Sequence, residues 1–324
     1  MGRHFCRRAV LVLCSALVLG NFARAETYPS RPVKIIVPFP AGGSNDIIAR
    51  ILAQKIQERT GQTFVIENRA GAGGNIGADA VATSAADGYT LLLTAPPPLT
   101  TNLALYKKLP YDPKAFTPIA LVATVQMVLM VHPSLPAKNV GELVALAKAK
   151  PGTINFGSSG NGTTNHLAAE LLKSMTGIDI VHVPYKGAAP AMNDLVAGHI
   201  PMMFDNMPAV LPQVEGKHVN AIAVAGLERS PSLPNVPTIA ESGVPGFNAI
   251  SWFGLVAPPK TPAPVVTKLV GELNEILKMP DVKTRFAELG AEPGTLTDAA
   301  FGQFLAEDTA KWTSLIMKTG ATIN

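Results

Sequence analysis

The sequence predicts an α/β protein with two similar lobes, each a mainly parallel sheet flanked by helices. Short apolar segments rich in β-branched residues alternate with amphipathic helical segments, which is typical of parallel sheets. The order of strand, glycine turn and helix occurs twice, after residue 33 and again after residue 153. The spacing from Gly43 to Arg69 equals that from Gly160 to Lys186, 26 residues. A structural duplication explains this repeat, although parallel sheets share the same rhythm by default.

The first repeat begins with a buried strand at 33–39 and a tight turn at 40–43. A helix follows from Ser44, because its isoleucines and Leu52 recur at the three- and four-residue spacing of one helical face. Gly61 is expected to end this helix, as glycine commonly does. The remaining elements are a strand at 64–68, a glycine-rich loop at 70–74, a helix at 75–85 and a strand at 90–94.

The second repeat has a strand at 153–157, a turn at 158–162 and a helix from Thr163 that ends at Gly177. A strand at 180–184, a loop at 185–187, a helix at 189–197 and a strand at 201–205 follow. The C-terminal part predicts a strand at 250–257 and helices at 264–278, 281–289 and 298–318. We place the lobe boundaries in the apolar stretch 119–132 and the turn-rich stretch 230–247. Lobe 1 then comprises 26–126 plus 248–324, lobe 2 comprises 127–247, and the two crossings predict a hinge.

The first 25 residues have the three parts of a secretory signal peptide. Arg3, Arg7 and Arg8 precede an apolar run at 9–20, and Ala23-Arg24-Ala25 is a cleavage site before Glu26. An uncleaved anchor is the alternative, but a membrane helix needs about 20 apolar residues. We therefore expect a cleaved signal and a periplasmic protein.

Removal of this segment changes the charge of the chain. The full sequence has Lys+Arg 27 and Asp+Glu 23, a net charge of +4. The signal carries four arginines, no acidic residue and both cysteines, Cys6 and Cys14. The mature chain is therefore neutral and lacks thiols, so we expect no nucleic acid partner, no thiolate metal site and no redox pair.

Several enzyme and cofactor motifs are incomplete. Residues 40–46 lack the Gly-Lys-Ser/Thr ending of a phosphate loop, and residues 71–77 have one residue too many for a dinucleotide fingerprint. Asn161 replaces the second glycine of a nucleophile elbow, and the histidines form no HExxH pair. We expect no catalytic residues, no cofactor and no metal. An exported enzyme remains an alternative that turnover of a bound acid would reveal.

Two glycine turns that open helices are the physical signal for binding. Unpaired backbone N–H groups and the positive end of the helix dipole make such N-termini anion sites. Ser44, Asn45, Thr163 and Thr164 can add side-chain contacts, although each turn alone is also an ordinary helix cap. Asp205, after the last strand of the second repeat, can accept from a ligand amine or hydroxyl or cap the next helix. The pair of turns favours a carboxylate clamp at the carboxyl ends of the strands.

Long stretches of the mature chain resemble the extracytoplasmic receptors of tripartite tricarboxylate transporters, the Bug type. The resemblance lies in 28–39, 41–50, 67–77, 87–90, 160–170, 183–187 and 204–206, which include Ala-Gly-Gly-Ser-Asn-Asp, Gly-Ala-Gly-Gly-Asn-Ile-Gly and Val-Pro-Tyr-Lys-Gly. It implies a two-lobed periplasmic binding protein of type II-like fold with the ligand cleft between the lobes. Such a receptor closes on a small organic acid and delivers it to membrane permease subunits, and we expect a monomer.

The resemblance also implies that carboxylates are held mainly by backbone amides and bridging water. The expected ligand-binding residues are Phe39, Ala41, Gly42, Gly43, Asn45, Asp46, Ala95, Ser158, Gly160, Thr163, Thr164, His166, Tyr185 and Asp205. Residues 95–98 are richer in proline than the family pattern, which points to ligand specificity. The particular acid stays open, and a ligand sensor for a signalling partner is the alternative to a transport receptor.

Overall fold

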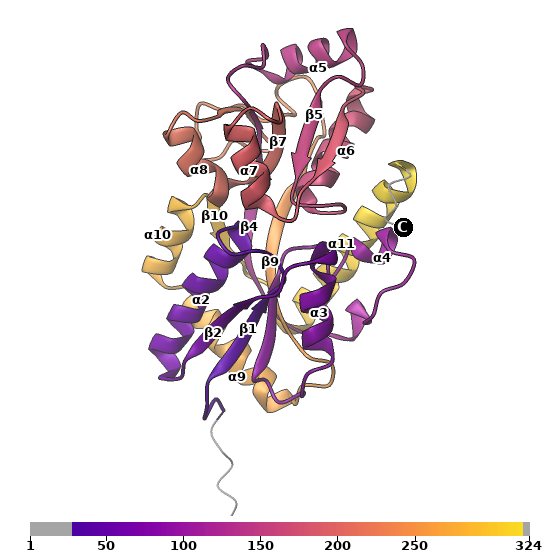
Figure 1. The fold of residues 1–324 in the computed structure, drawn as a ribbon. Coiled ribbons are helices and arrows are strands. Elements are labelled where there is room, and N and C mark those ends of the chain that lie inside the picture. The colour runs from indigo at the N-terminus through magenta and orange to yellow at the C-terminus, as the bar shows by residue number, and fades with distance from the viewer. Residues whose placement is uncertain (1–27, 320–324) are drawn as a thin grey trace, which may run out of the picture. The chain divides into compact units, whose positions relative to one another are not determined.

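The computed structural model describes residues 28–319, so the predicted signal peptide at 1–25 lies outside the described residues. The chain divides into two units, Met1–Ser30 and Arg31–Asn324, and every described helix and strand belongs to the second (Figure 1). The strands are β1 Val33–Val37, β2 Phe64–Asn68, β3 Thr90–Thr94, β4 Thr117–Val131, β5 Asn155–Ser158, β6 Val181–Pro184, β7 Met202–Asn206, β8 Asn220–Val224, β9 Ile250–Ala257 and β10 Ala291–Pro293. The helices are α2 Ser44–Thr60, α3 Asn75–Ala82, α4 Asn102–Leu105, α5 Val140–Ala149, α6 Thr164–Thr176, α7 Ala188–Val196, α8 Met207–Glu215, α9 Ala263–Ile276, α10 Pro280–Glu288 and α11 Asp298–Thr319, with 3-10 turns η1 Ala72–Gly74 and η2 Pro113–Ala115.

One set of strands has the order β2-β1-β3-β9-β4. β1 pairs in parallel with β2 and β3, whereas β9 is antiparallel to both β3 and β4. Helices α2, α3, α9 and α11 pack against these strands. Buried residues such as Ile36, Leu92, Trp252 and Phe301 form the core here.

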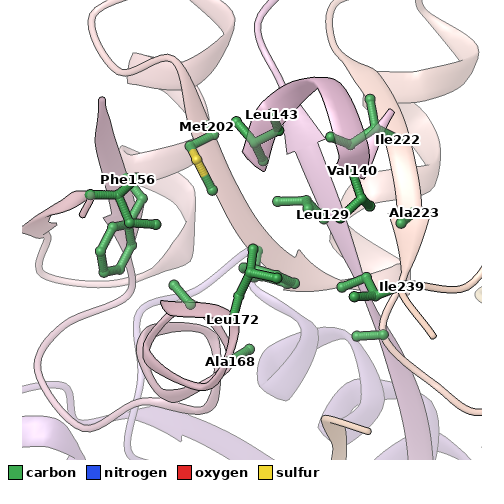
Figure 2. Packing of buried hydrophobic residues seen from close by; sticks show 14 of the residues in the cluster. Leu129, Val140, Leu143, Phe156, Ala168, Leu172, Met202, Ile222, Ala223 and Ile239 are labelled. Carbon is green, nitrogen blue, oxygen red and sulfur yellow. The ribbon is translucent and has the colours of Figure 1, made fainter. Parts of the chain in front are cut away.

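A second set of strands has the order β4-β7-β5-β6, with β8 also paired to β4. β5 is parallel to β6 and β7, and β4 is antiparallel to β7. Figure 2 shows the core on one face of these strands, where Leu129 of β4 and Phe156 of β5 pack with Leu172 of α6.

Strand β4 belongs to both sets. Thr117–Gln126 pair with β9, and Met127–Val131 pair with β7. The predicted α/β class is confirmed, and the sheets are mixed because antiparallel β9 and β4 join the parallel strands. The lobe boundaries expected near 127 and 247 stay a prediction, which this change of partner at Met127 supports.

The ends of two helices follow the glycine signals. Gly61 after α2 and Gly177 after α6 both have φ of 68°, the left-handed conformation that glycine adopts without steric cost. Helices α2 and α6 thus have fixed C-terminal ends, and their N-termini start directly after β1 and β5 at the carboxyl edge of the parallel strands.

Candidate ligand-binding site

A cavity of about 40 Å³ lies where the carboxyl ends of β1, β3, β5 and β7 meet the helices that follow them. Residues that follow β1 and β3 line one side of it, and residues that follow β5 and β6 or end β7 line the other. The first group is Phe39, Pro40, Gly43, Ser44, Asn45, Ala95 and Pro97, and the second is Ser159, Thr163, Thr164, Asn165, Ala188, Asp205 and Asn206. Two larger cavities adjoin it through shared lining residues. The first, of about 280 Å³, shares Phe39, Pro40 and Ser159, and the second, of about 200 Å³, shares Gly43, Ala188 and Asp205.

Four helices begin at the central cavity. Residues in the first turn or at the N-cap of α2, α6, α7 and α8 line it. None of these four helix ends has a side-chain capping hydrogen bond within the described chain. By contrast, the N-cap of α5, Asn139, accepts from the amide of Glu142 and lines none of the three cavities. Four uncapped N-termini around one cavity concentrate positive dipole ends and amide donors, which is a setting for an anion.

Buried side-chain atoms at this cavity also lack partners. Ser44 Oγ, Asn45 Oδ1, Asp205 Oδ2 and Asn206 Oδ1 are buried and have no hydrogen-bond partner among the described residues. All four residues line the central cavity. Because buried polar atoms in native proteins are nearly always hydrogen-bonded, these four atoms are open to hydrogen bonds from water or from a polar ligand.

Asp205 is an acidic residue in the lining of the central cavity, where the helix N-termini favour an anion. It is only 2% exposed, and its Oδ1 accepts from the amide of Asn206 at 2.8 Å. Burial raises the pKa of Asp205 to about 7, and the hydrogen bond from Asn206 opposes that rise. Asn206, the N-cap of α8, makes no side-chain cap, and Asp205 bonds its neighbour's amide rather than an amide inside α8.

Basic side chains are nearly absent from the lining. Lys186 is the only lysine or arginine among the described residues that line the three cavities. It lies in the larger side cavity and is exposed. Tyr185 lines the same cavity, but its hydroxyl donates to Asp194 at 2.6 Å. An anion in the central cavity would therefore depend on backbone amides and neutral side chains.

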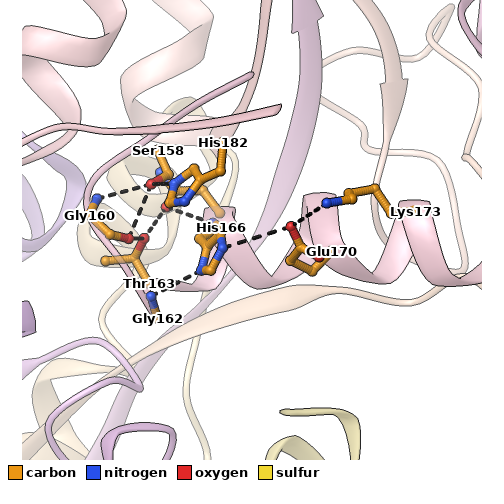
Figure 3. A network of polar contacts seen from close by, with 9 residues as sticks. Ser158, Gly160, Gly162, Thr163, His166, Glu170, Lys173 and His182 are labelled. Carbon is orange, nitrogen blue, oxygen red and sulfur yellow. Dashed lines mark hydrogen bonds and ion pairs between the residues drawn. The ribbon is translucent and has the colours of Figure 1, made fainter. Parts of the chain in front are cut away.

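A polar network holds the loop that precedes α6 (Figure 3). Ser158 is fully buried; its Oγ lies 2.5 Å from Nε2 of His182, and it donates to the carbonyl of Gly160. Nδ1 of His166 accepts from the amide of Gly162 at 3.0 Å, and the two imidazole rings stack with centroids 3.9 Å apart. Burial lowers the pKa of His166 to about 3 and that of His182 to about 4. Both histidines are therefore neutral at pH 7 and shape the loop.

The turn before α2 has its own support. Asp46 Oδ2 accepts from the amide of Gly42 at 3.1 Å and from Nε of Arg50 at 2.9 Å. Although burial raises the pKa of Asp46, these hydrogen bonds outweigh it and the pKa is lowered overall. Asp46 therefore stays ionised and fixes the turn 40–43 beside the cavity.

The structure brings many of the expected binding residues together. Phe39, Gly43, Asn45, Ala95, Thr163, Thr164 and Asp205 line the central cavity, and Gly42, Gly160 and Tyr185 line its neighbours. Ala41 is exposed and lines none of the three. Asp46, Ser158 and His166 lie behind the wall, where they hold the two turns. Ligand contact by any of these residues stays a prediction.

Sequence reasoning left some wall residues out of the expected set. Asn165, Ala188 and Asn206 line the central cavity, each in the first turn or at the N-cap of its helix. For Asn165 and Ala188, the helices predicted from Thr163 and from residue 189 were the available signal, whereas the helix after Asn206 had no predicted bounds. Only the fold shows that α7 and α8 start at the same cavity as α2 and α6.

Comparison with known proteins identifies the family. The family model for the tripartite tricarboxylate transporter family receptor matches residues 48–321. The chain belongs to this receptor family. Protein BugT of Bordetella pertussis is 41% identical over 301 residues, 92% of each chain. The R. palustris protein Rpa4515, solved with adipate, is 39% identical with a TM-score of 0.89, covering 90% of this chain and 98% of that one. MatC (Rpa3494) from Rhodopseudomonas palustris, solved with bound malate, is 33% identical with a TM-score of 0.84, covering 89% and 100%.

These similarities confirm the resemblance to Bug-type receptors and the two-lobed fold of periplasmic binding proteins. The family is one of solute-binding receptors. Within residues 28–319 no helix is long and apolar enough to cross a membrane. The same range contains no cluster of three or more His, Cys, Asp or Glu that could hold a metal ion.

Proposed function

We propose that this receptor captures a small carboxylate in the periplasm by lobe closure and delivers it to the membrane permease of a tripartite transporter. The observation that carries the proposal is the central cavity, where four uncapped helix N-termini meet with no lysine or arginine in the lining. Adipate and malate, bound in two similar proteins, support the ligand class. The predicted signal peptide supports export.

The binding free energy would come from oriented backbone. Hydrogen bonds to a charged partner contribute roughly 1.5–3 kcal/mol each, which offsets removal of the carboxylate from water. The glycine turn before α2 and the loop before α6 belong to different strand sets, so an anion between them ties the two sets together. Ligand would thus shift the population toward a closed form.

The moving parts in this proposal are lobes 26–126 plus 248–324 and 127–247. The hinge lies where β4 changes partners after Gln126 and where β9 begins at Ile250. The permease then recognises a surface that is formed only in the closed form. We propose that the protein acts as a monomer and returns its ligand unchanged, with no enzymatic turnover.

A thermal-shift panel of carboxylic acids tests the binding role. The true ligand should raise stability as RT ln(1 + [L]/Kd), whereas matched amides or alcohols should leave it unchanged. Stabilisation by uncharged analogues and by no acid would refute the carboxylate assignment. Deletion of the gene should abolish uptake of that acid; loss of a transcriptional response with intact uptake would favour a sensor instead.

A further inference from the structure

Asp205 is an acidic residue placed where the structure favours an anion. Asp205 lines the central cavity, and the residue is 2% exposed. Oδ1 is occupied by the amide of Asn206, whereas Oδ2 has no hydrogen-bond partner among the described residues. Oδ2 is therefore the carboxyl oxygen left for a further hydrogen bond.

Among residues 28–319, Asp205 forms no ion pair, and the hydrogen bond from Asn206 is what opposes the rise of its pKa. Asp205 lies on β7, which packs against β4, β5, α6, α7 and α8, and α2 begins at the same cavity. β4 and β5 contain no titratable residue. The charged groups on α2 pair as Asp46 with Arg50, Lys55 with Glu58, and Arg59 with Glu272. On α6, Glu170 pairs with Lys173 and His166 is neutral, and on α7, Asp194 bonds to Tyr185 and His199. Glu215 is the last residue of α8, at the end of that helix opposite to the cavity.

We propose that Asp205 binds the ligand carboxylate as a neutral carboxylic acid, so that each anion is captured together with one proton. The proposal rests on the carboxylate-binding function above and adds the protonation state and proton linkage of the site. In the step, a proton from solvent adds to Oδ2, and the new O–H donates to a ligand oxygen. No covalent bond of the ligand changes.

Electrostatic repulsion between Asp205 and a ligand carboxylate determines how the affinity changes with pH. Burial raises the pKa of Asp205 to about 7. A carboxylate within hydrogen-bond distance raises that pKa further, because two like charges in a buried site disfavour each other. Between the pKa of the free protein and that of the complex, binding takes up one proton, so affinity falls about tenfold for each unit of rising pH.

The test is the pH dependence of Kd, measured by calorimetry on the mature protein from pH 6 to 9. The probes are succinate, malate and adipate. For the wild type we expect affinity to weaken about tenfold per pH unit above pH 7. Titrations at pH 8 in two buffers of different ionisation enthalpy should report uptake of about one proton per ligand. Uptake of no proton would overturn the proposal without any variant.

The Asp205→Asn variant sharpens the test, because an amide imitates the neutral acid. The amide oxygen can accept from Asn206, and the amide nitrogen donates at every pH. We expect a flat pH profile and, at pH 9, binding at least about tenfold tighter than the wild type. A loss of affinity across the whole pH range would overturn the proposal, and a loss seen for malate alone would show that the charged carboxylate accepts from the ligand hydroxyl.

The Asp308→Asn variant is the matched control. Asp308 is a second buried acid whose pKa is raised overall, chiefly by burial, and it bonds to Thr100 and Trp312 without lining any of the three cavities. This variant should keep the wild-type slope. Binding of no probe at any pH would count against the proposed function and this inference together, whereas tight binding with a flat wild-type profile would refute the inference alone.

Discussion

A valine in place of Gly43 should block ligand binding while sparing the fold. Gly43 is the N-cap of α2 and has φ of −84° and ψ of 170°, an extended conformation that valine adopts readily. A Cβ at this position would have Pro40 O at 3.8 Å and Ala188 Cβ at 3.9 Å as its nearest neighbours, which are ordinary contacts. The new methyl groups would enter a cavity of about 40 Å³ that Gly43 and Ala188 both line.

The expected magnitude follows from mass action. At a ligand concentration of 100 times Kd, the wild type gains about 2.7 kcal/mol of stability. If the valine raises Kd about 100-fold, the same concentration contributes only about 0.4 kcal/mol. For a chain of this size, the ligand-induced rise in Tm should fall from about 5–10 °C to about 1 °C.

The assay is thermal unfolding with and without the ligand acid. Gly271→Ala is the matched control, because Gly271 lies inside α9 and nothing lies within 4 Å of its Cβ position. Alanine there should stabilise the ligand-free protein by about 0.5–1 kcal/mol and leave the ligand-induced rise unchanged. A Gly43→Val protein with wild-type Tm and a wild-type ligand response would refute the assigned site.

Three other predictions follow from contacts around the cleft. Leu167→Ala should lower the free energy of unfolding by about 2–5 kcal/mol, because Leu167 is fully buried with Leu105, Trp312 and Ile316; a loss under about 1 kcal/mol in urea titrations followed by tryptophan fluorescence would contradict that packing. Thr101→Val removes the buried hydrogen bond from the Thr101 hydroxyl to the carbonyl of Gly162, which connects the two strand sets. Calorimetry should therefore show about tenfold weaker ligand binding. An unchanged Kd would contradict a role of this bond in closure. In the folded protein the pKa of His166 is lowered to about 3 and that of His182 to about 4. Below about pH 6.5 the unfolded chain therefore binds protons that the native state does not. The free energy of unfolding should decrease as the pH falls from about 6.5 toward 4. The urea midpoint should drop between pH 7 and pH 4.5, less so in a His182→Gln variant, and a midpoint that does not change with pH would be inconsistent with neutral buried histidines.

The sequence predicted elements well where the signal was local. β2, β3 and β9 have the expected bounds, and Gly61 and Gly177 end their helices as glycine turns require. Strand β4 was expected only as an apolar boundary region, because its partners on either side come from distant parts of the chain. Helix α8 carries Pro208 and Pro212, which weaken any local helix signal.

The site was predictable to the extent that it follows from strand–turn–helix units. The turns at Gly43 and Gly160 were identified because glycine and the following helix pattern occur together in the sequence. The helix starts at Ala188 and Asn206 meet the same cavity only through tertiary pairing of β5, β6 and β7. The raised pKa of Asp205 depends on complete burial, which no neighbour in the sequence specifies.

The central claim is that backbone at uncapped helix N-termini holds a small carboxylate. Native mass spectrometry of the freshly purified mature protein, with fragmentation of whatever it releases, tests this claim most directly. We expect one carboxylic acid bound per chain in the wild type and in Gly271→Ala, and none in Gly43→Val. A bound ligand without a carboxylate, or an acid that stays bound to Gly43→Val as in the wild type, would contradict the claim.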